Sequence, residues 1–150
     1  MRPLTERDIR TSFVNCSKGE AKRLTVPRDL ADQPWDDLDF FGWYESRERA
    51  YLVTETTGVA LRVTTARRGL CSLCLTPHTG DGVALMTARK SGARGQRGDS
   101  VGAYICADLA CSLYLRGKKD SRRMEESLTL AEQVDRTMAN LDAFLKRVTG

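Results

Sequence analysis

The sequence lacks several features that common functional classes require. It has a single histidine, His78, which lies in the Pro-containing segment 76–80. A Ser-His-Asp or Cys-His nucleophilic site needs a histidine as its base, and this one is interpreted as a turn residue. Gly92, Gly95 and Gly98 are spaced like a phosphate loop, but no GK[ST] ending and no predicted helix follow them. We therefore expect a binding protein with no small-molecule substrate, not an enzyme.

Long apolar runs and targeting signals are also missing. No run approaches the roughly 18 apolar residues that a membrane span needs, and the N-terminus is charged and polar. We expect a protein of the cytoplasm, where thiols stay reduced, with no membrane partner. Aromatic residues make up 7% of the chain, and only Tyr104 and Tyr114 lie near its most basic segment. This scarcity argues against sequence-specific reading of single-stranded RNA.

Four of the five cysteines form two close pairs. Cys71 and Cys74 make a CxxC, Cys106 and Cys111 make a C-x4-C, and the 31 residues between the pairs can form a β-hairpin. Two thiolate pairs brought together by a hairpin suit one tetrahedral structural Zn²⁺, with no open position for water or substrate. Two disulfides or a redox CxxC are the alternatives, and a reducing compartment favours metal over both. Cys16 is interpreted as a small apolar residue of a helix.

Positive charge gathers around this cysteine segment. Residues 66–123 carry 11 Lys and Arg against 4 Asp and Glu, whereas residues 1–65 carry 10 against 11. A basic cluster attracts acidic protein surfaces and phosphate backbones. The predicted partner surface has two parts: a Gly-rich hairpin tip with Arg89, Lys90, Arg94 and Arg97, and a linker with Arg116, Lys118 and Lys119.

The pattern of the whole chain predicts an α+β fold. Thr5 can cap a short N-terminal helix, and the turn at Thr57-Gly58 predicts a hairpin over 51–65. Segments 83–89 and 101–105 predict a second hairpin, with a flexible tip at 91–100, that delivers the second cysteine pair to a helix start. An apolar stripe from Met124 to Val148 predicts a long C-terminal helix. We expect an N-terminal helical segment and linker over 1–34 and a treble-clef zinc-finger domain over 35–150.

The cysteine segment resembles a known family. Gly69 to Cys74, a basic hairpin, and the segment Val101 to Ser112 resemble the C-terminal treble-clef zinc finger of the elongation factor G-binding proteins, the FusB-type family of fusidic acid resistance proteins. The likeness covers roughly residues 35–148 and includes Phe41-Gly-Trp43 and the hairpin that ends at Arg62. Its most specific piece is the Gly-x-Tyr-x-Cys-x-Asp-x-x-Cys segment that ends at Cys111.

The resemblance implies a function. In that family the domain binds elongation factor G on the ribosome and promotes its release, which relieves the stall caused by fusidic acid. It implies Cys71, Cys74, Cys106 and Cys111 as zinc ligands. It also implies basic and aromatic contacts, for which the nearest candidates are Arg89, Lys90, Tyr104 and Phe144. FusB-type proteins carry a helical bundle before this domain, whereas only residues 1–34 precede it here, so factor binding is expected more firmly than resistance. The alternative is a ribosome- or RNA-binding zinc module whose basic loops contact phosphates.

Overall fold

The computed structural model describes residues 1–150 and confirms an α+β fold built on one antiparallel sheet. Five strands follow one another across it in chain order: β1 (Phe41–Ser46), β2 (Arg49–Val53), β3 (Gly58–Thr65), β4 (Val83–Arg89) and β5 (Ser100–Cys106). Around the sheet lie α1 (Glu6–Ser12), α2 (Lys18–Arg23), α3 (Gly92–Gln96), α4 (Cys111–Leu115) and α5 (Leu130–Thr149). Two 3₁₀ turns, Leu30–Asp32 and Trp35–Asp37, lead into β1. None of these helices combines the length and the apolar character of a membrane-spanning segment.

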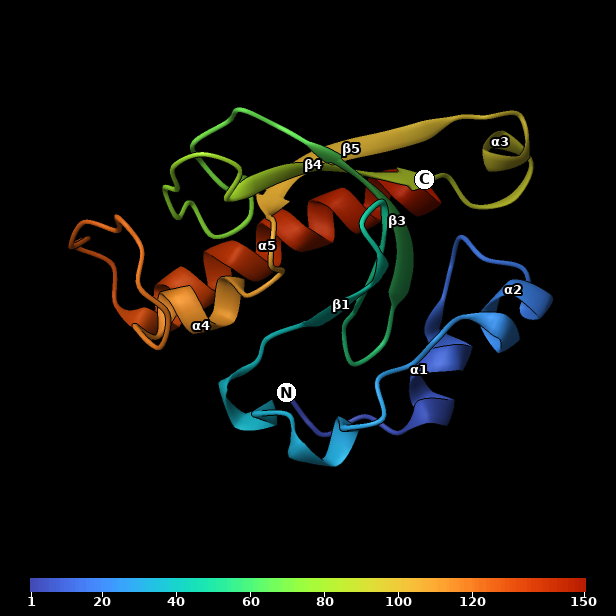
Figure 1. The fold of residues 1–150 in the computed structure, drawn as a ribbon, viewed down its shortest axis with the longest axis horizontal. Coiled ribbons are helices and arrows are strands. Elements are labelled where there is room, and N and C mark those ends of the chain that lie inside the picture. Colours follow the sequence, from blue (N-terminus) through green and yellow to red (C-terminus); the bar gives the residue numbers. More distant parts are fainter.

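The two faces of the sheet bury different parts of the chain. Successive strand residues point to opposite faces, and in β2 Ala50 and Leu52 join the large core with α5, whereas Tyr51 and Val53 join a second cluster. That second cluster holds apolar side chains of the N-terminal segment, among them Ile9. Figure 1 shows α5 running along the sheet near β4 and β5, with α1 and α2 at the opposite side of the molecule. Residues on both sides of position 34 therefore share one cluster, and the predicted division there stays a prediction.

Two sequence expectations need correction. The C-terminal helix begins at Leu130, because Thr129 and Glu132 form a capping box, whereas Met124 is 83% exposed. The tip of the second hairpin was expected to be flexible, but it contains the short helix α3. Its Gly95 is irreplaceable, since a Cβ atom there would lie 1.7 Å from the Lys90 carbonyl oxygen.

A buried asparagine joins the N-terminal segment to the sheet. Asn15 Nδ2 donates to the carbonyl oxygens of Ala60 and Arg89, both at 3.0 Å, and Asn15 Oδ1 accepts from Ala60 N–H at 2.8 Å. These bonds satisfy backbone groups of β3 and β4 at once. The Asn15 amide therefore forms hydrogen bonds that the backbone of a further strand would form at this point.

We predict that Asn15→Ala lowers the free energy of unfolding by about 2 kcal/mol, because it leaves buried backbone groups without partners. Urea unfolding followed by circular dichroism measures this change. Gln96→Ala, at an exposed position of α3, is the control and should change stability by less than about 0.5 kcal/mol. An equal effect of the two substitutions would contradict the role of the Asn15 amide.

Candidate metal centre

The first cysteine pair lies on a tight turn before β4. Leu75 N–H donates to the Cys71 carbonyl oxygen at 3.0 Å, and Cys71 N–H donates to the Thr76 carbonyl oxygen at 3.1 Å. Leu75 adopts a left-handed conformation with φ of 59°, which closes the turn and points both sulfurs to one side. We call residues 71–76 the knuckle.

The second pair lies where β5 passes into α4. Cys106 is the last residue of β5 and Cys111 is the first residue of α4. Leu109, with φ of 58°, turns the chain between them. Gly42 of β1 lies against this turn, and a Cβ atom there would come within 2.7 Å of the Leu109 side chain. The first strand therefore supports the turn that positions the second pair.

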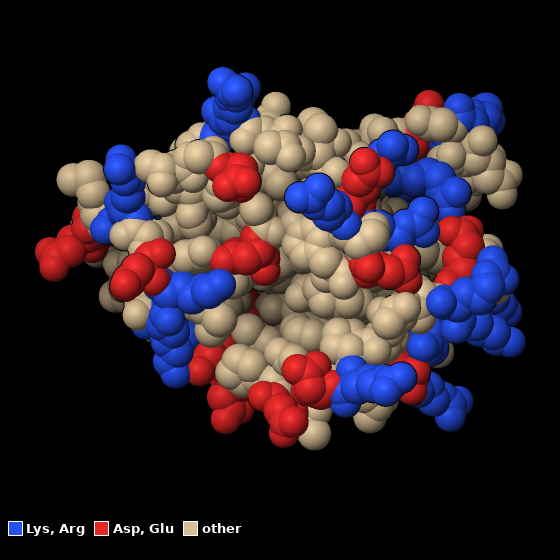
Figure 2. All heavy atoms as spheres, viewed as in Figure 1, with Lys and Arg blue, Asp and Glu red and all other residues tan.

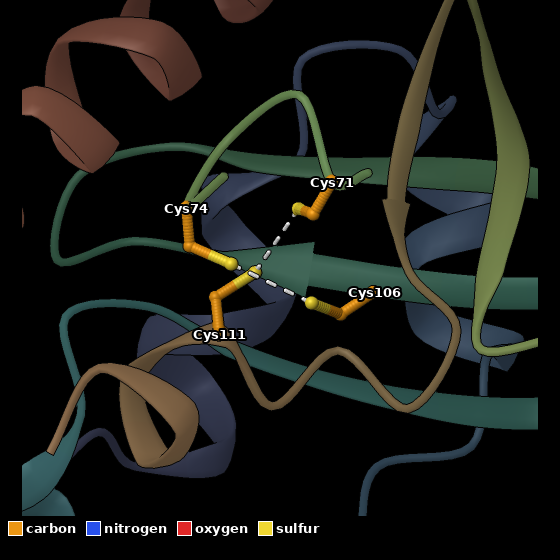
Figure 3. Close-up of side chains that lie close together, drawn as sticks. All are labelled: Cys71, Cys74, Cys106 and Cys111. Carbon is orange, nitrogen blue, oxygen red and sulfur yellow. Dashed lines mark hydrogen bonds between the residues drawn. The ribbon is translucent and has the colours of Figure 1, made fainter. Parts of the chain in front are cut away.

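The four sulfurs fit one tetrahedral zinc ion. Cys71, Cys74, Cys106 and Cys111 are fully buried, and their Sγ atoms all lie within 4.8 Å of one another. Cys71 and Cys111 Sγ are 3.7 Å apart, and Cys74 and Cys106 Sγ are 3.5 Å apart (Figure 3). A tetrahedron with Zn–S bonds of about 2.3 Å has sulfurs about 3.8 Å apart, whereas a disulfide needs about 2.05 Å. The predicted ligand set is thus brought together, and the disulfide alternative is not supported.

The protonation of the four thiols also favours a cation. Hydrogen bonding with Cys106 and Cys111 lowers the pKa of Cys71. Hydrogen bonding with Cys106 has the opposite effect on Cys111 and raises the pKa of its thiol. The thiols therefore compete for protons, and not all of them can ionise without a counter-charge. A divalent cation removes this conflict, because it stabilises four thiolates together.

Polar groups around the sulfurs complete the centre. Leu73 N–H donates to Cys71 Sγ at 3.4 Å, and Thr76 Oγ1 lies 3.0 Å from Cys74 Sγ. His78 Nε2 lies 3.2 Å from Cys106 Sγ. Sequence reasoning treated His78 as a turn residue and missed this contact, since only the fold brings the turn against the end of β5. The Tyr114 ring packs edge-on against His78 with 4.7 Å between the ring centroids.

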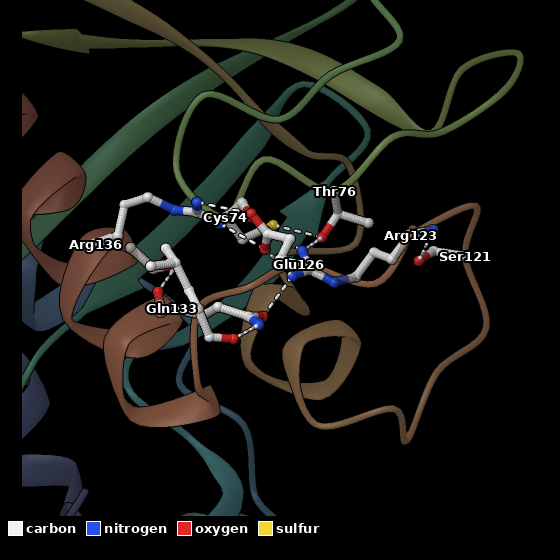
Figure 4. Close-up of polar contacts among 9 residues, drawn as sticks. Cys74, Thr76, Ser121, Arg123, Glu126, Gln133 and Arg136 are labelled. Carbon is white, nitrogen blue, oxygen red and sulfur yellow. Dashed lines mark hydrogen bonds and ion pairs between the residues drawn. The ribbon is translucent and has the colours of Figure 1, made fainter.

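A partly buried arginine ties the segment before α5 to the knuckle. Arg123 Nη1 donates to the Cys74 carbonyl oxygen at 3.0 Å and to Thr76 Oγ1 at 2.9 Å (Figure 4). Its Nη2 donates to Glu126 and to Gln133 of α5, and Glu126 also accepts two bonds from Arg136. Since Thr76 Oγ1 accepts from Arg123, its own proton is free to point at the Cys74 sulfur. A Zn²⁺ with four thiolates carries a charge of −2, which these two guanidinium groups would partly offset.

The predicted hairpin-tip residues lie together around α3. Arg89 pairs with Glu20 at 3.2 Å, and Lys90 and Arg94 contact the carbonyl oxygen of Gly150. Arg97 is exposed and forms no salt bridge. Tyr104 lies further along β5, half-buried beneath Arg68, whose guanidinium carbon is 4.9 Å from the ring centroid.

The remaining predicted contacts are less available. Phe144 is 1% exposed and belongs to the core between α5 and the sheet, so its side chain cannot reach a partner surface. The Arg116 side chain, 16% exposed, makes a two-pronged pair with Asp39 and has a structural role. Lys118 and Lys119 pair with Asp37 and Asp108 but remain about half exposed. The aspartates that pair with these basic residues lie in other segments of the chain, so the sequence pattern does not indicate the ion pairs.

A knuckle, a strand end and a helix start that converge on four thiolates define a treble-clef zinc finger with a structural site. The model of the FBP C-terminal treble-clef zinc-finger family matches residues 8–148, and the chain belongs to that family. The match begins upstream of the expected boundary near residue 35. Comparisons with the curated proteins and with the solved structures find no match.

We predict that Cys106→Ser abolishes stoichiometric zinc binding, because a hydroxyl replaces one of four thiolates. The amides of β4, β5 and the knuckle should then lose protection in hydrogen exchange. Cys16→Ser is the matched control, since Cys16 lies outside the cluster and burial raises the pKa of its thiol to about 11. Elemental analysis that finds equal zinc in both variants would contradict the ligand set.

We predict that His78→Phe keeps one zinc per chain but weakens its retention by about 10-fold, because the N–H···S contact is lost while the ring packing on Tyr114 remains. Competition with a chromophoric chelator measures the change. Unchanged retention would assign His78 to packing alone, and complete loss of zinc would make it a ligand.

Proposed function

We propose that this protein binds elongation factor G through the surface around α3. The observation that carries the proposal is membership of the FBP zinc-finger family over nearly the whole chain. The FusB-type proteins that the cysteine segment resembles bind that factor with this domain. A partner of this kind would place the protein's action in the cytoplasm.

Hydrogen bonds join the base of α3 to three parts of the chain, an arrangement that favours protein recognition. Ser91 N–H donates to the Val148 carbonyl oxygen at 2.9 Å, and Ser91 Oγ donates to the Val14 carbonyl oxygen at 2.7 Å. Lys90 N–H donates to the Asp99 carbonyl oxygen at 2.9 Å. The N-terminal segment, the hairpin and α5 thus meet at the base of α3. A surface ordered before binding loses less entropy when a partner docks.

The charges on this surface suit an acidic partner. Arg97 is exposed and forms no salt bridge, whereas Arg94, also exposed, donates one hydrogen bond to the carbonyl oxygen of Gly150 at 3.2 Å. Exposed charges at the rim of an interface act mainly on the rate of association. The zinc centre lies at the opposite end of β5, and its proposed part is to hold the hairpin in shape rather than to touch the factor.

We predict that Arg94→Glu/Arg97→Glu slows association with immobilised elongation factor G by about 10-fold at low salt, with a smaller effect at high salt. Surface plasmon resonance measures both rates, and zinc content verifies the fold. Arg28→Glu/Arg122→Glu is the control, because it makes the same charge change at two exposed residues without salt bridges.

Two results would contradict the proposal. If the parent protein does not bind the factor, the function is wrong. If the control variant slows association as much as the α3 variant, binding follows net charge and the surface around α3 is not the contact.

A further inference from the structure

A groove opens on the sheet face away from α5, between α2 and the ends of β3, β4 and β5. It has a volume of about 630 Å³. We call it the sheet groove, and its charged or hydroxyl-bearing walls include Glu20, Glu48, Arg49, Arg62, Thr87 and Arg89. In Figure 2 Lys and Arg gather around a hollow on the side of the molecule where α2 and α3 lie, with acidic groups among them.

Two arginines occupy opposite positions on neighbouring strands in this groove. Arg49 of β2 and Arg62 of β3 are direct cross-strand partners, so their side chains leave the same face of the sheet. Neither guanidinium forms a salt bridge, and both residues are exposed. Like charges placed directly opposite each other destabilise a sheet. An anion bound between the two guanidinium groups would replace their repulsion with attraction.

A third arginine is fixed at the edge of the groove. Arg89 Nη2 donates to the Asn15 carbonyl oxygen at 3.0 Å and pairs with Glu20 at 3.2 Å. Thr87, directly opposite Arg62 in the register, adds a hydroxyl beside the guanidinium groups. Guanidinium forks with nearby hydroxyl donors are the groups that bind phosphate oxygens.

The carboxylates in the groove select among phosphate-bearing ligands. Glu20 is already paired with Arg89, whereas Glu48 forms no salt bridge and can accept a hydrogen bond from a ribose 2′-hydroxyl group. A single strand of RNA carries one phosphate and one 2′-hydroxyl per nucleotide. A groove that presents guanidinium and carboxylate groups together offers partners for both of these groups.

The same face continues to an aromatic ring. In the register Arg62 lies opposite Thr87, and Thr87 lies opposite Gly102; two residues further along β5 is Tyr104, on the same face. Gly102 has no side chain of its own, and the Leu85 and Thr87 side chains lie over it, since a Cβ atom there would be 3.2 Å from Leu85 Cδ1 and 3.3 Å from Thr87 Cγ2. Arg68 lies over the ring, and a base could take its place by stacking.

We propose that the sheet groove binds the ribose-phosphate backbone of single-stranded RNA, without reading its sequence. Arg49 and Arg62 contact phosphates, Glu48 accepts from a ribose hydroxyl, and Tyr104 stacks on a base. This site does not depend on the proposed binding of elongation factor G, which uses the surface around α3.

The test is fluorescence anisotropy with a labelled 12-nucleotide oligouridine. The parent should bind it, and Arg49→Gln/Arg62→Gln should weaken binding by 10-fold or more at about 50 mM salt. The slope of log K against log salt should fall by about 1.4, or 0.7 for each lost phosphate contact. Arg28→Gln/Arg122→Gln removes the same charge elsewhere and should leave at least half of the affinity. The thermal midpoint of the groove variant should match or exceed that of the parent, because a repulsion is removed.

Several outcomes would overturn the proposal. If the RNA does not bind, or if both variants lose affinity equally, the groove is not an RNA site. If oligodeoxyuridine binds as tightly as oligouridine, the ribose contacts are wrong. If a 12-residue polyglutamate competes as well as RNA, the occupant is an acidic protein segment. If millimolar inorganic phosphate displaces the RNA completely, the site holds a free anion instead.

Discussion

The convergence of four thiolates on one point is the constraint on which the rest of the structure depends. It ties the knuckle before β4 to the end of β5 and the start of α4, segments that are separated by up to 40 residues. A structural zinc ion contributes on the order of 10–16 kcal/mol of binding free energy, comparable with the whole stability of a domain of this size. We therefore expect the β4–β5 hairpin to lose order when the metal is removed.

The zinc site also positions segments of the chain that supply no ligand. Asn140 of α5 donates to the Leu73 carbonyl oxygen at 2.9 Å, and Arg123 donates to the Cys74 carbonyl oxygen at 3.0 Å. Both bonds end on knuckle carbonyls whose directions are set by the closed turn. The long helix and the segment before it are thus aligned by the same geometry that binds zinc. The N-terminal segment is different, since it is held by a separate apolar cluster and by the Asn15 amide.

The parts of the structure that follow from local patterns could be predicted from the sequence. The spacing within each cysteine pair predicted the zinc site, and alternation around Thr57-Gly58 predicted the β2–β3 hairpin, because each of these signals lies within a few residues. The predicted start of α5 was too early, because the apolar stripe also includes residues before Thr129, which caps the helix. The resemblance made Phe144 a candidate contact, but its side chain packs into the core between α5 and the sheet. A single sequence does not reveal strand register or contacts between distant segments. The Arg116–Asp39 pair, the contact of His78 with Cys106 and the opposite positions of Arg49 and Arg62 depend on these features.

Zinc K-edge X-ray absorption of the purified protein tests the central claim most directly. The account predicts four sulfur neighbours at about 2.3 Å and no nitrogen neighbour in the first shell. A fit that requires three sulfurs and one nitrogen at about 2.0–2.1 Å would make His78 a ligand in place of a cysteine, and would contradict the four-thiolate centre.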